Sequence, residues 1–142
     1  MSAQDFASAA EALVGAPFRP GGRDPQTGLD CLGLVAAALL ACSFRGCVPA
    51  SRTLRRRGDW QADAVALSAG FVPAPGAIAR GDVLLIRCSP IQPHVVVAAS
   101  DGLFVHAHAG LGKVVLGPAD PAWRIAGRWR LPELSEEPLW QP

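Results

Sequence analysis

One stretch of the chain decides the fold: Gly28-Leu29-Asp30-Cys31-Leu32-Gly33-Leu34-Val35. Asp30 can cap a helix through its side-chain oxygen, which places Cys31 in the first helical turn. A thiol there meets unpaired backbone N–H groups and the positive end of the helix dipole, and both favour the thiolate. The sequence therefore predicts a nucleophile at Cys31. The alternative is an inert buried cysteine, which is the commoner role of a lone cysteine.

The residues that follow Cys31 are almost wholly apolar as far as Cys42. A helix without charges is buried on most sides, so we expect it to hold the thiol rigidly. Gly33 is unusual in its interior, because glycine costs a helix about 1 kcal/mol relative to alanine. A close backbone approach by another segment or by a ligand would explain this glycine.

Composition limits the class of protein. The chain has 142 residues, half of them hydrophobic, and a net charge of +1. This indicates one globular domain, over residues 1–132, with a tail over 133–142. The near-neutral balance argues against nucleic-acid or membrane partners. The first residues show no secretory signal, and we expect synthesis in the cytoplasm. Cys42 and Cys47 could pair in an oxidising compartment, but we expect free thiols.

Helices precede strands in the predicted order of elements. We expect helices over Ser2–Val14, from Cys31 to near Ser43, and over Trp60–Ala69 with Asp59 as its cap, with an irregular loop over Ala16–Leu29. The β-rich runs are Asp82–Cys88, His94–Ala99, Leu103–Ala107, Lys113–Leu116 and Ile125–Leu131. This order is typical of an α+β domain, with N-terminal helices packed on an antiparallel sheet of about five strands.

The three histidines of the chain fall on two neighbouring strand runs. Ser100-Asp101-Gly102 suits a three-residue hairpin loop with glycine in the left-handed position. The pairs in that register are Ala99 with Leu103, Val96 with His106, and His94 with His108. All three histidines then share one face of the sheet, with His94 and His106 as diagonal neighbours. A two-residue turn would instead place His94 on the opposite face from the other two.

A cysteine and histidines in this arrangement fit thiol catalysis. The thiol attacks an acyl carbon, one histidine moves the proton, and a third polar group fixes the tautomer of that imidazole. Backbone N–H groups at the helix start, including that of Cys31, could stabilise the oxyanion. Each histidine alone is more simply explained as an ordinary strand residue. A zinc site of Cys88 with the three histidines is a further alternative, although the ligand spacing is unusual for zinc.

Five motifs occur in the order in which they occur in one known family. They are Pro17-Phe18-Arg19-Pro20-Gly21-Gly22, then Gly28–Val35, Arg80-Gly81-Asp82-Val83-Leu84-Leu85-Ile86, His94-Val95-Val96-Val97, and Gly102-Leu103-Phe104-Val105-His106-Ala107. With them the chain resembles the NlpC-type cell-wall peptidases, a papain-like family of cysteine endopeptidases. The resemblance covers most of the chain, from Gly15 to about Ala109.

The resemblance implies a papain-like fold with Cys31 as nucleophile, His94 as base and His106 as orienting residue. His108 remains a rival to His106, because it lies directly across from His94 in the favoured register. The implied substrate is the peptidoglycan stem peptide, cut between D-γ-glutamate and the diamino acid, and no metal or organic cofactor is implied. Phe18, Asp30, Leu32 and Gly33 are the substrate-binding candidates.

Some positions depart from the family pattern. Leu32 stands where the family generally has serine, and Phe18 and Pro20 stand where it usually has tyrosine and tryptophan. The short chain and Leu32 resemble the branch found in phages and gene transfer agents, which implies phage-like tail proteins as partners and a tail particle that carries the enzyme to the cell wall. These departures also motivate a second hypothesis, a catalytically retired tail-tip structural or wall-binding module on the same fold.

Overall fold

The computed structural model describes residues 2–42, 47–50, 62–87 and 93–132. The helices within these ranges are α1 (Ala3–Ala12), α2 (Cys31–Ala41) and α4 (Ala62–Ser68). The main sheet has the order β3-β8-β4-β5-β6-β7 and all its neighbouring strands are antiparallel. Its strands are β3 (Val72–Pro73), β4 (Val83–Arg87), β5 (Pro93–Ala98), β6 (Leu103–His108), β7 (Lys113–Pro118) and β8 (Arg124–Arg130).

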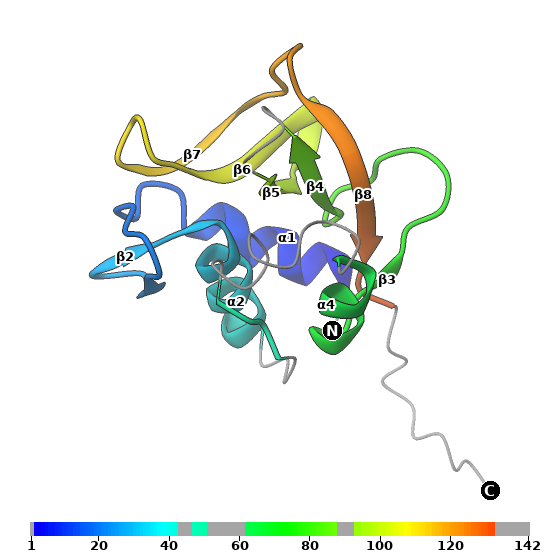
Figure 1. Ribbon diagram of the computed structural model, residues 1–142, viewed down its shortest axis with the longest axis horizontal. Helices are drawn as coiled ribbons and strands as arrows, with labels where there is room; N and C mark the ends of the chain where they lie inside the picture. Colours follow the sequence, from blue (N-terminus) through cyan, green and yellow to red (C-terminus); the bar gives the residue numbers. More distant parts are fainter. Residues whose placement is uncertain (1, 43–46, 51–61, 88–92, 133–142) are drawn as a thin grey trace, which may run out of the picture.

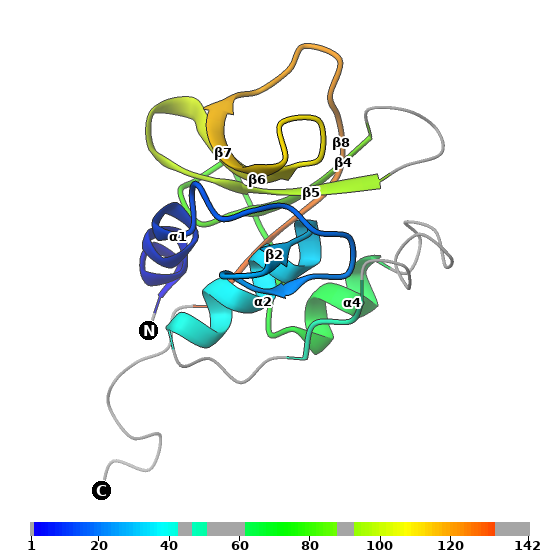
Figure 2. The ribbon, with the colours of Figure 1, turned by 90° about the vertical axis from the view of Figure 1, so that its left-hand side faces the viewer.

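The helices gather on one side of this sheet, and the connection between β7 and β8 arcs away from them (Figures 1 and 2). The predicted α+β class with an antiparallel sheet is confirmed. The sheet has six strands rather than about five, because the short edge strand β3 pairs with β8. The expected loop over Ala16–Leu29 was wrong in part, since β1 (Arg23–Asp24) and β2 (Gly28–Leu29) form a small antiparallel pair within it.

Helix α1 begins with the predicted Ser2 cap. The Asp5 N–H donates to Ser2 Oγ at 3.2 Å, and the Asp5 carboxylate accepts from the Ser2 N–H at 3.0 Å. Two orphan donors of the first turn are thus satisfied. The helix then buries Phe6 and Ala10 completely against the core. The predicted cap at Asp59, Trp60, Cys88 and the tail over 133–142 lie outside the described residues.

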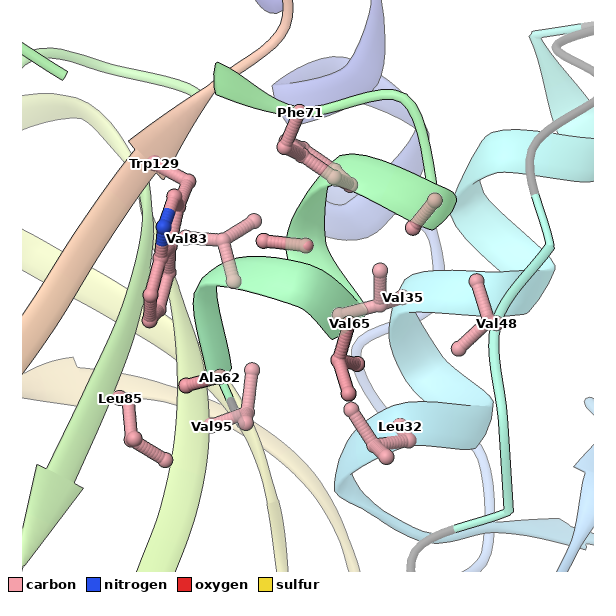
Figure 3. Close-up of a pocket in the computed structure, with 12 residues that line it drawn as sticks. Leu32, Val35, Val48, Ala62, Val65, Phe71, Val83, Leu85, Val95 and Trp129 are labelled. Carbon is pink, nitrogen blue, oxygen red and sulfur yellow. The ribbon is translucent and has the colours of Figure 1, made fainter. Parts of the chain in front are cut away.

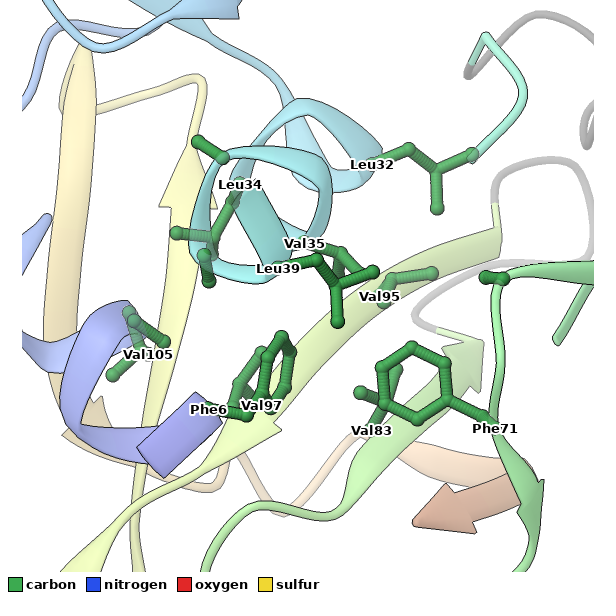
Figure 4. Packing of buried hydrophobic residues seen from close by; sticks show 14 of the residues in the cluster. Phe6, Leu32, Leu34, Val35, Leu39, Phe71, Val83, Val95, Val97 and Val105 are labelled. Carbon is green, nitrogen blue, oxygen red and sulfur yellow. The ribbon is translucent and has the colours of Figure 1, made fainter. Parts of the chain in front are cut away.

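The core has two parts because strand side chains alternate between the two faces of the sheet. On the helix side, Val95, Val97 and Val105 pack with residues of α1 and α2 in one buried cluster (Figure 4). On the other side, Val96 and Phe104 belong to a smaller cluster. The described helices are all too short or too polar to cross a bilayer.

Asp82 links the sheet to the segment before it. Its carboxylate is fully buried and accepts hydrogen bonds from Arg130 Nε at 2.6 Å, Arg128 Nη1 at 2.8 Å and the Ala79 N–H at 3.0 Å. Burial raises the pKa of Asp82, but the hydrogen bonds from Arg130, Ala79 and Arg128 outweigh burial and hold this pKa below its ordinary value. Asp82 is therefore an ionised anchor between β4 and β8.

The two cysteines near the end of α2 do not form a disulfide. Cys42 and Cys47 are free thiols, as predicted. The Cys42 thiol donates to the Ala38 carbonyl at 3.1 Å. Burial is the main cause that raises the pKa of Cys42, so it stays protonated at neutral pH.

Candidate active site

Helix α2 begins as the sequence predicts, with Asp30 as its cap and Cys31 as its first residue. Asp30 is 5 % exposed, and its carboxylate accepts from the Gly33 N–H at 2.8 Å and from the Gly21 N–H at 2.9 Å. The first bond closes the helix start, and the second ties it to the loop before β1. Cys31 is half-buried and packs against the main core cluster. The capping carboxylate therefore fixes the backbone that carries the thiol.

Gly33 lies against another segment of the chain. A Cβ atom at this position would lie 1.9 Å from the Gly22 carbonyl oxygen, a distance that only a backbone shift could relieve. The expected close approach is therefore made by the loop before β1. The contact explains why the helix tolerates a glycine here despite its cost.

Phe18 belongs to a segment that joins β7 and β2 to the start of α2. Its N–H donates to the Gly112 carbonyl at 2.8 Å, while the preceding Pro17 carbonyl accepts from the Leu29 N–H at 2.8 Å. The side chain is half-buried against the core cluster. Its backbone contacts hold this segment beside the residues that lead into the nucleophile helix.

The histidines follow the favoured hairpin register. Val97 pairs with Val105 and Ala98 with Phe104, as expected for a three-residue loop. Both Asp101 and Gly102 in that loop adopt positive φ, at 62° and 71°. The predicted register is confirmed near the turn, but the predicted pairs of Val96 with His106 and of His94 with His108 are absent from the ladder of these described strands.

The same register brings the three imidazoles together. His94 Nε2 lies 3.5 Å from His106 Nδ1, and the two ring centroids are 5.6 Å apart. The ring of His108 contacts His106 on its other side, with centroids 5.7 Å apart. The expectation that His94, His106 and His108 share one face is confirmed, and so is the diagonal contact of His94 with His106.

His108 makes a different contact from the other two histidines. Its Nδ1 atom accepts from the Leu111 N–H at 3.0 Å, in the turn between β6 and β7. That bond uses Nδ1 as an acceptor and holds the ring at its own turn. Within the described residues, His106 rather than His108 is the histidine that lies within hydrogen-bond distance of His94.

Burial keeps His94 and His106 neutral at neutral pH. The pKa of His94 is lowered to about 4, mainly by burial and also by the charges that His106 and His108 would carry. Burial also lowers the pKa of His106, again with a contribution from His108. A neutral imidazole can accept a proton, so His94 has the ionisation state of a general base at neutral pH.

The histidines point away from the helices. Val95 and Val105 belong to the helix-side cluster, so alternation sends the side chains of His94 and His106 to the other face. The two strands pair only at Val97 and Ala98, and therefore no ladder pair joins them at the level of these histidines. His94 is the second residue of β5. Helix α2 and the His94 side chain therefore lie on opposite faces of the sheet at this level.

The residues directly after Cys31 and His94 line one pocket. Leu32 enters it from the first turn of α2, and Val95 from β5 (Figure 3). The other side chains around it, among them Val65 of α4 and Trp129 of β8, are also apolar. The cavity measures about 40 Å³. Helix α2 also contacts β5 and β6. The first turn of α2 and the start of β5 thus line the same pocket.

The four substrate-binding candidates have structural contacts of their own. Both carboxylate oxygens of Asp30 are used by backbone donors, Gly33 faces the loop before β1, and Leu32 is 5 % exposed in an apolar pocket. Their contact with substrate stays a prediction. Among the described residues, no three His, Cys, Asp or Glu side chains form a group that could hold a metal ion, and Cys88 of the zinc alternative lies outside them.

One residue near the histidines was missed by the sequence analysis. Trp123, in the connection between β7 and β8, lies with its ring centroid 5.5 Å from that of His106. The only signal in the sequence is an aromatic residue in a turn rich in Asp and Pro, Asp120-Pro121-Ala122-Trp123. No periodicity connects that turn with the histidine strand.

Comparison with solved structures places this fold among NlpC/p60 domains. The NlpC/p60 domain of the peptidoglycan hydrolase SagA matches with a TM-score of 0.59 and 25 % sequence identity, over 94 % of this chain and 100 % of that one. The peptidoglycan hydrolase RipB of Mycobacterium tuberculosis matches with a TM-score of 0.60 and 22 % identity, over 90 % of this chain and 63 % of that one. The structural neighbours are thus NlpC/p60 peptidoglycan hydrolases, and the papain-like fold is confirmed.

A non-catalytic protein has the same fold. RipD of Mycobacterium tuberculosis, a non-catalytic NlpC/p60 domain protein adapted to peptidoglycan binding, matches with a TM-score of 0.55 and 17 % identity, over 93 % of this chain and 97 % of that one. No family model and no curated protein sequence matches the chain. The fold alone therefore does not separate cleavage from binding, and the residues of the site must decide between them.

Proposed function

We propose that this protein is a cysteine peptidase that hydrolyses an amide bond of peptidoglycan stem peptides, of the D-γ-glutamyl–diamino acid type. The likeness to NlpC/p60 peptidoglycan hydrolases supports the substrate class. The observation that carries the proposal is that Leu32 and Val95, which directly follow Cys31 and His94, line one pocket. The start of α2, which carries Cys31, and the start of β5, which carries His94, therefore contribute side chains to the same pocket, and this supports the pairing of the two residues that we propose.

The proposed reaction begins with the Cys31 thiol at the start of α2. Its sulfur attacks the amide carbon while His94 takes the thiol proton, and the backbone N–H of Cys31 is suited to stabilise the oxyanion. His94 then protonates the leaving amine, which leaves a thioester on Cys31. Water hydrolyses the thioester with His94 as base and restores the thiol.

His106 has the orienting role in this proposal. Its Nδ1 atom lies 3.5 Å from His94 Nε2, so a hydrogen bond between them leaves the other nitrogen of His94, Nδ1, for the thiol proton. Because burial holds His94 neutral, the proton leaves the thiol as the sulfur attacks rather than in the resting enzyme. This neutral pair distinguishes the proposed site from one that rests as a thiolate and imidazolium.

Mass spectrometry of muropeptides incubated with the purified protein tests the proposal. The wild type is expected to release stem-peptide fragments, and Cys31→Ala is expected to release none. Cys47→Ala is the matched control, because Cys47 is an exposed thiol far along the chain from the site. Fragments from Cys31→Ala at the wild-type rate would contradict the mechanism.

The second candidate function is wall binding without cleavage, favoured by the likeness to the non-catalytic RipD. In that case the protein would bind muropeptides tightly and return them intact in the same experiment. The presence of Cys31, His94 and His106 supports the enzyme, because binding alone requires neither the thiol nor the histidine pair.

The biological setting is a further part of the proposal. Leu32 resembles the corresponding position of the branch in phages and gene transfer agents, which makes a phage-like tail particle the proposed carrier. Detection of the protein in purified particles from its source would support this setting. A preparation of intact particles that lacks it would contradict the setting without affecting the chemistry.

A further inference from the structure

Trp123 contacts His106 on the face of the sheet away from the helices. Its indole meets the ring of His106 edge-on, at 5.5 Å between centroids and an interplanar angle of 88°. It also meets Phe104, two residues earlier on the same strand, at 5.7 Å and 76°. Both contacts have the edge-to-face geometry that aromatic rings prefer. Trp123 therefore packs on the face of β6 that carries the histidine.

A turn delivers the indole to this place. The Asp120 carboxylate accepts from the Ala122 N–H at 2.8 Å, and the Asp120 carbonyl accepts from the Trp123 N–H at 2.9 Å. Asp side chains commonly stabilise turns in this way. The turn lies in the β7–β8 connection, which arcs away from the helices (Figure 2). The backbone of Trp123 is thus held by local hydrogen bonds, and its indole by packing.

The contacts of His106 leave it little freedom. Its side chain is 8 % exposed, with Trp123, His94 and His108 against its ring. A ring packed from several directions keeps one rotamer, and a hydrogen bond shielded from water is stronger than an exposed one. Removal of the indole would open the His106 ring to water and to rotation.

We propose that Trp123 is a positioning residue, which holds the His106 ring so that its Nδ1 faces His94 and which excludes water from that contact. The proposal rests on the proposed peptidase function for its effect on turnover. Its structural part, the hold on His106, stands independently of any substrate. Trp123 touches no reacting atom and acts only through His106.

The first experiment is an NMR titration of the histidine ring protons in the full chain. The ionisable side chains in ring contact with His106 are His94 and His108, and both are retained in all variants. In Trp123→Ala, His106 is expected to titrate at clearly higher pH than in the wild type, since water reaches its ring. In Trp123→Phe, the pH at which His106 titrates is expected to return most of the way to the wild-type value. An unchanged titration of His106 in folded Trp123→Ala overturns the proposal, whatever the activity.

The second experiment is turnover of muropeptides. Trp123→Ala is expected to lower kcat at least tenfold with little change in KM, and Trp123→Phe to stay within about threefold of the wild type. Ile125→Ala is the matched control, because Ile125 is a 55 % exposed apolar side chain two residues away, and its turnover is expected to be unchanged.

Trp123→Leu keeps the test decisive if the alanine variant does not fold, since it retains apolar bulk without a ring. The Trp123→Leu variant is expected to turn over muropeptides more slowly than Trp123→Phe and to raise the pH at which His106 titrates. If Trp123→Leu and Trp123→Phe show the same turnover and the same titration pH of His106, the aromatic role of Trp123 is overturned. If the wild type itself shows no turnover, the proposed function fails, while the titration still decides whether Trp123 holds His106.

Discussion

His94 Nε2 and His106 Nδ1 lie 3.5 Å apart on the sheet face that points away from the helices. Burial lowers the pKa of both rings, that of His94 to about 4. Both imidazoles are therefore neutral at neutral pH. A neutral His94 can accept a proton at neutral pH, as the proposed role of base requires.

The acid limb of the pH–rate profile is expected to report this neutral pair. The profile of kcat/KM reports ionisation in the free enzyme, so activity should persist well below pH 6.5 and fall toward pH 4. In His108→Gln the limb should move to higher pH, because the charge of His108 is one cause that lowers the pKa of both other rings. An acid limb near pH 6.5 in the wild type would contradict the buried neutral pair.

Stability is expected to depend on pH through the same pair. His94 titrates at about 4 in the folded protein and near 6.5 when unfolded, so the unfolded chain binds the proton more strongly. The contribution of His94 to the free energy of unfolding is then fully present above pH 6.5. It is lost as pH falls toward 4, by up to about 3 kcal/mol. Urea unfolding at pH 7 and pH 4.5 measures the loss, which His94→Gln should reduce. Equal losses in the two proteins would count against the burial of His94.

Of the charged residues in the described ranges, Asp82 is the one whose substitution we expect to lower the free energy of unfolding most. Asp82→Asn leaves two arginines without their buried partner and should cost about 3 kcal/mol in urea unfolding. Glu11→Gln is the matched control, because it removes a partly exposed partner of Arg80 and should cost less than about 1 kcal/mol. If the two substitutions cost the same, Asp82 is not the anchor described above.

Gly33 is expected to admit no side chain. Gly33→Ala places a methyl group where the Gly22 carbonyl stands, so the loop before β1 must shift from the start of α2. We expect a loss of about 2 kcal/mol or more in thermal or urea unfolding, with lower reactivity of Cys31. Gly117→Ala is the control, because a Cβ atom there meets nothing within 4 Å, and it should be neutral or slightly stabilising. A stable Gly33→Ala with unchanged thiol reactivity would contradict the role of this contact.

Local signals explain what the sequence could predict. Asp30 before an apolar run marks the start of α2, and Ser100-Asp101-Gly102 sets the register that gathers the histidines. Both signals act over a few residues, through a cap and a turn, so tertiary structure does not have to be known. A close approach of another backbone segment to Gly33 could likewise be expected from the local sequence, although the loop that contains Gly22 could not be identified as that segment.

The remaining features depend on contacts between distant residues. The arginine partners of Asp82 lie 46 and 48 residues away, and strand β3 is a two-residue edge that includes a proline. The contact of Trp123 with His106 depends on the path of the β7–β8 connection. No periodicity encodes such a path, and a two-residue strand is too short to show one.

The central claim is that the imidazole of His94 takes the proton of the Cys31 thiol. Alkylation of Cys31 by iodoacetamide at pH 7, followed by peptide mass spectrometry, tests it without any substrate. The account predicts that His94→Gln slows alkylation of Cys31 at least tenfold, while His108→Gln leaves it within about twofold of the wild type, because a base in contact with the sulfur assists its attack. Equal alkylation rates in the wild type and His94→Gln would show that the thiol and the imidazole do not meet, and would contradict the proposed mechanism.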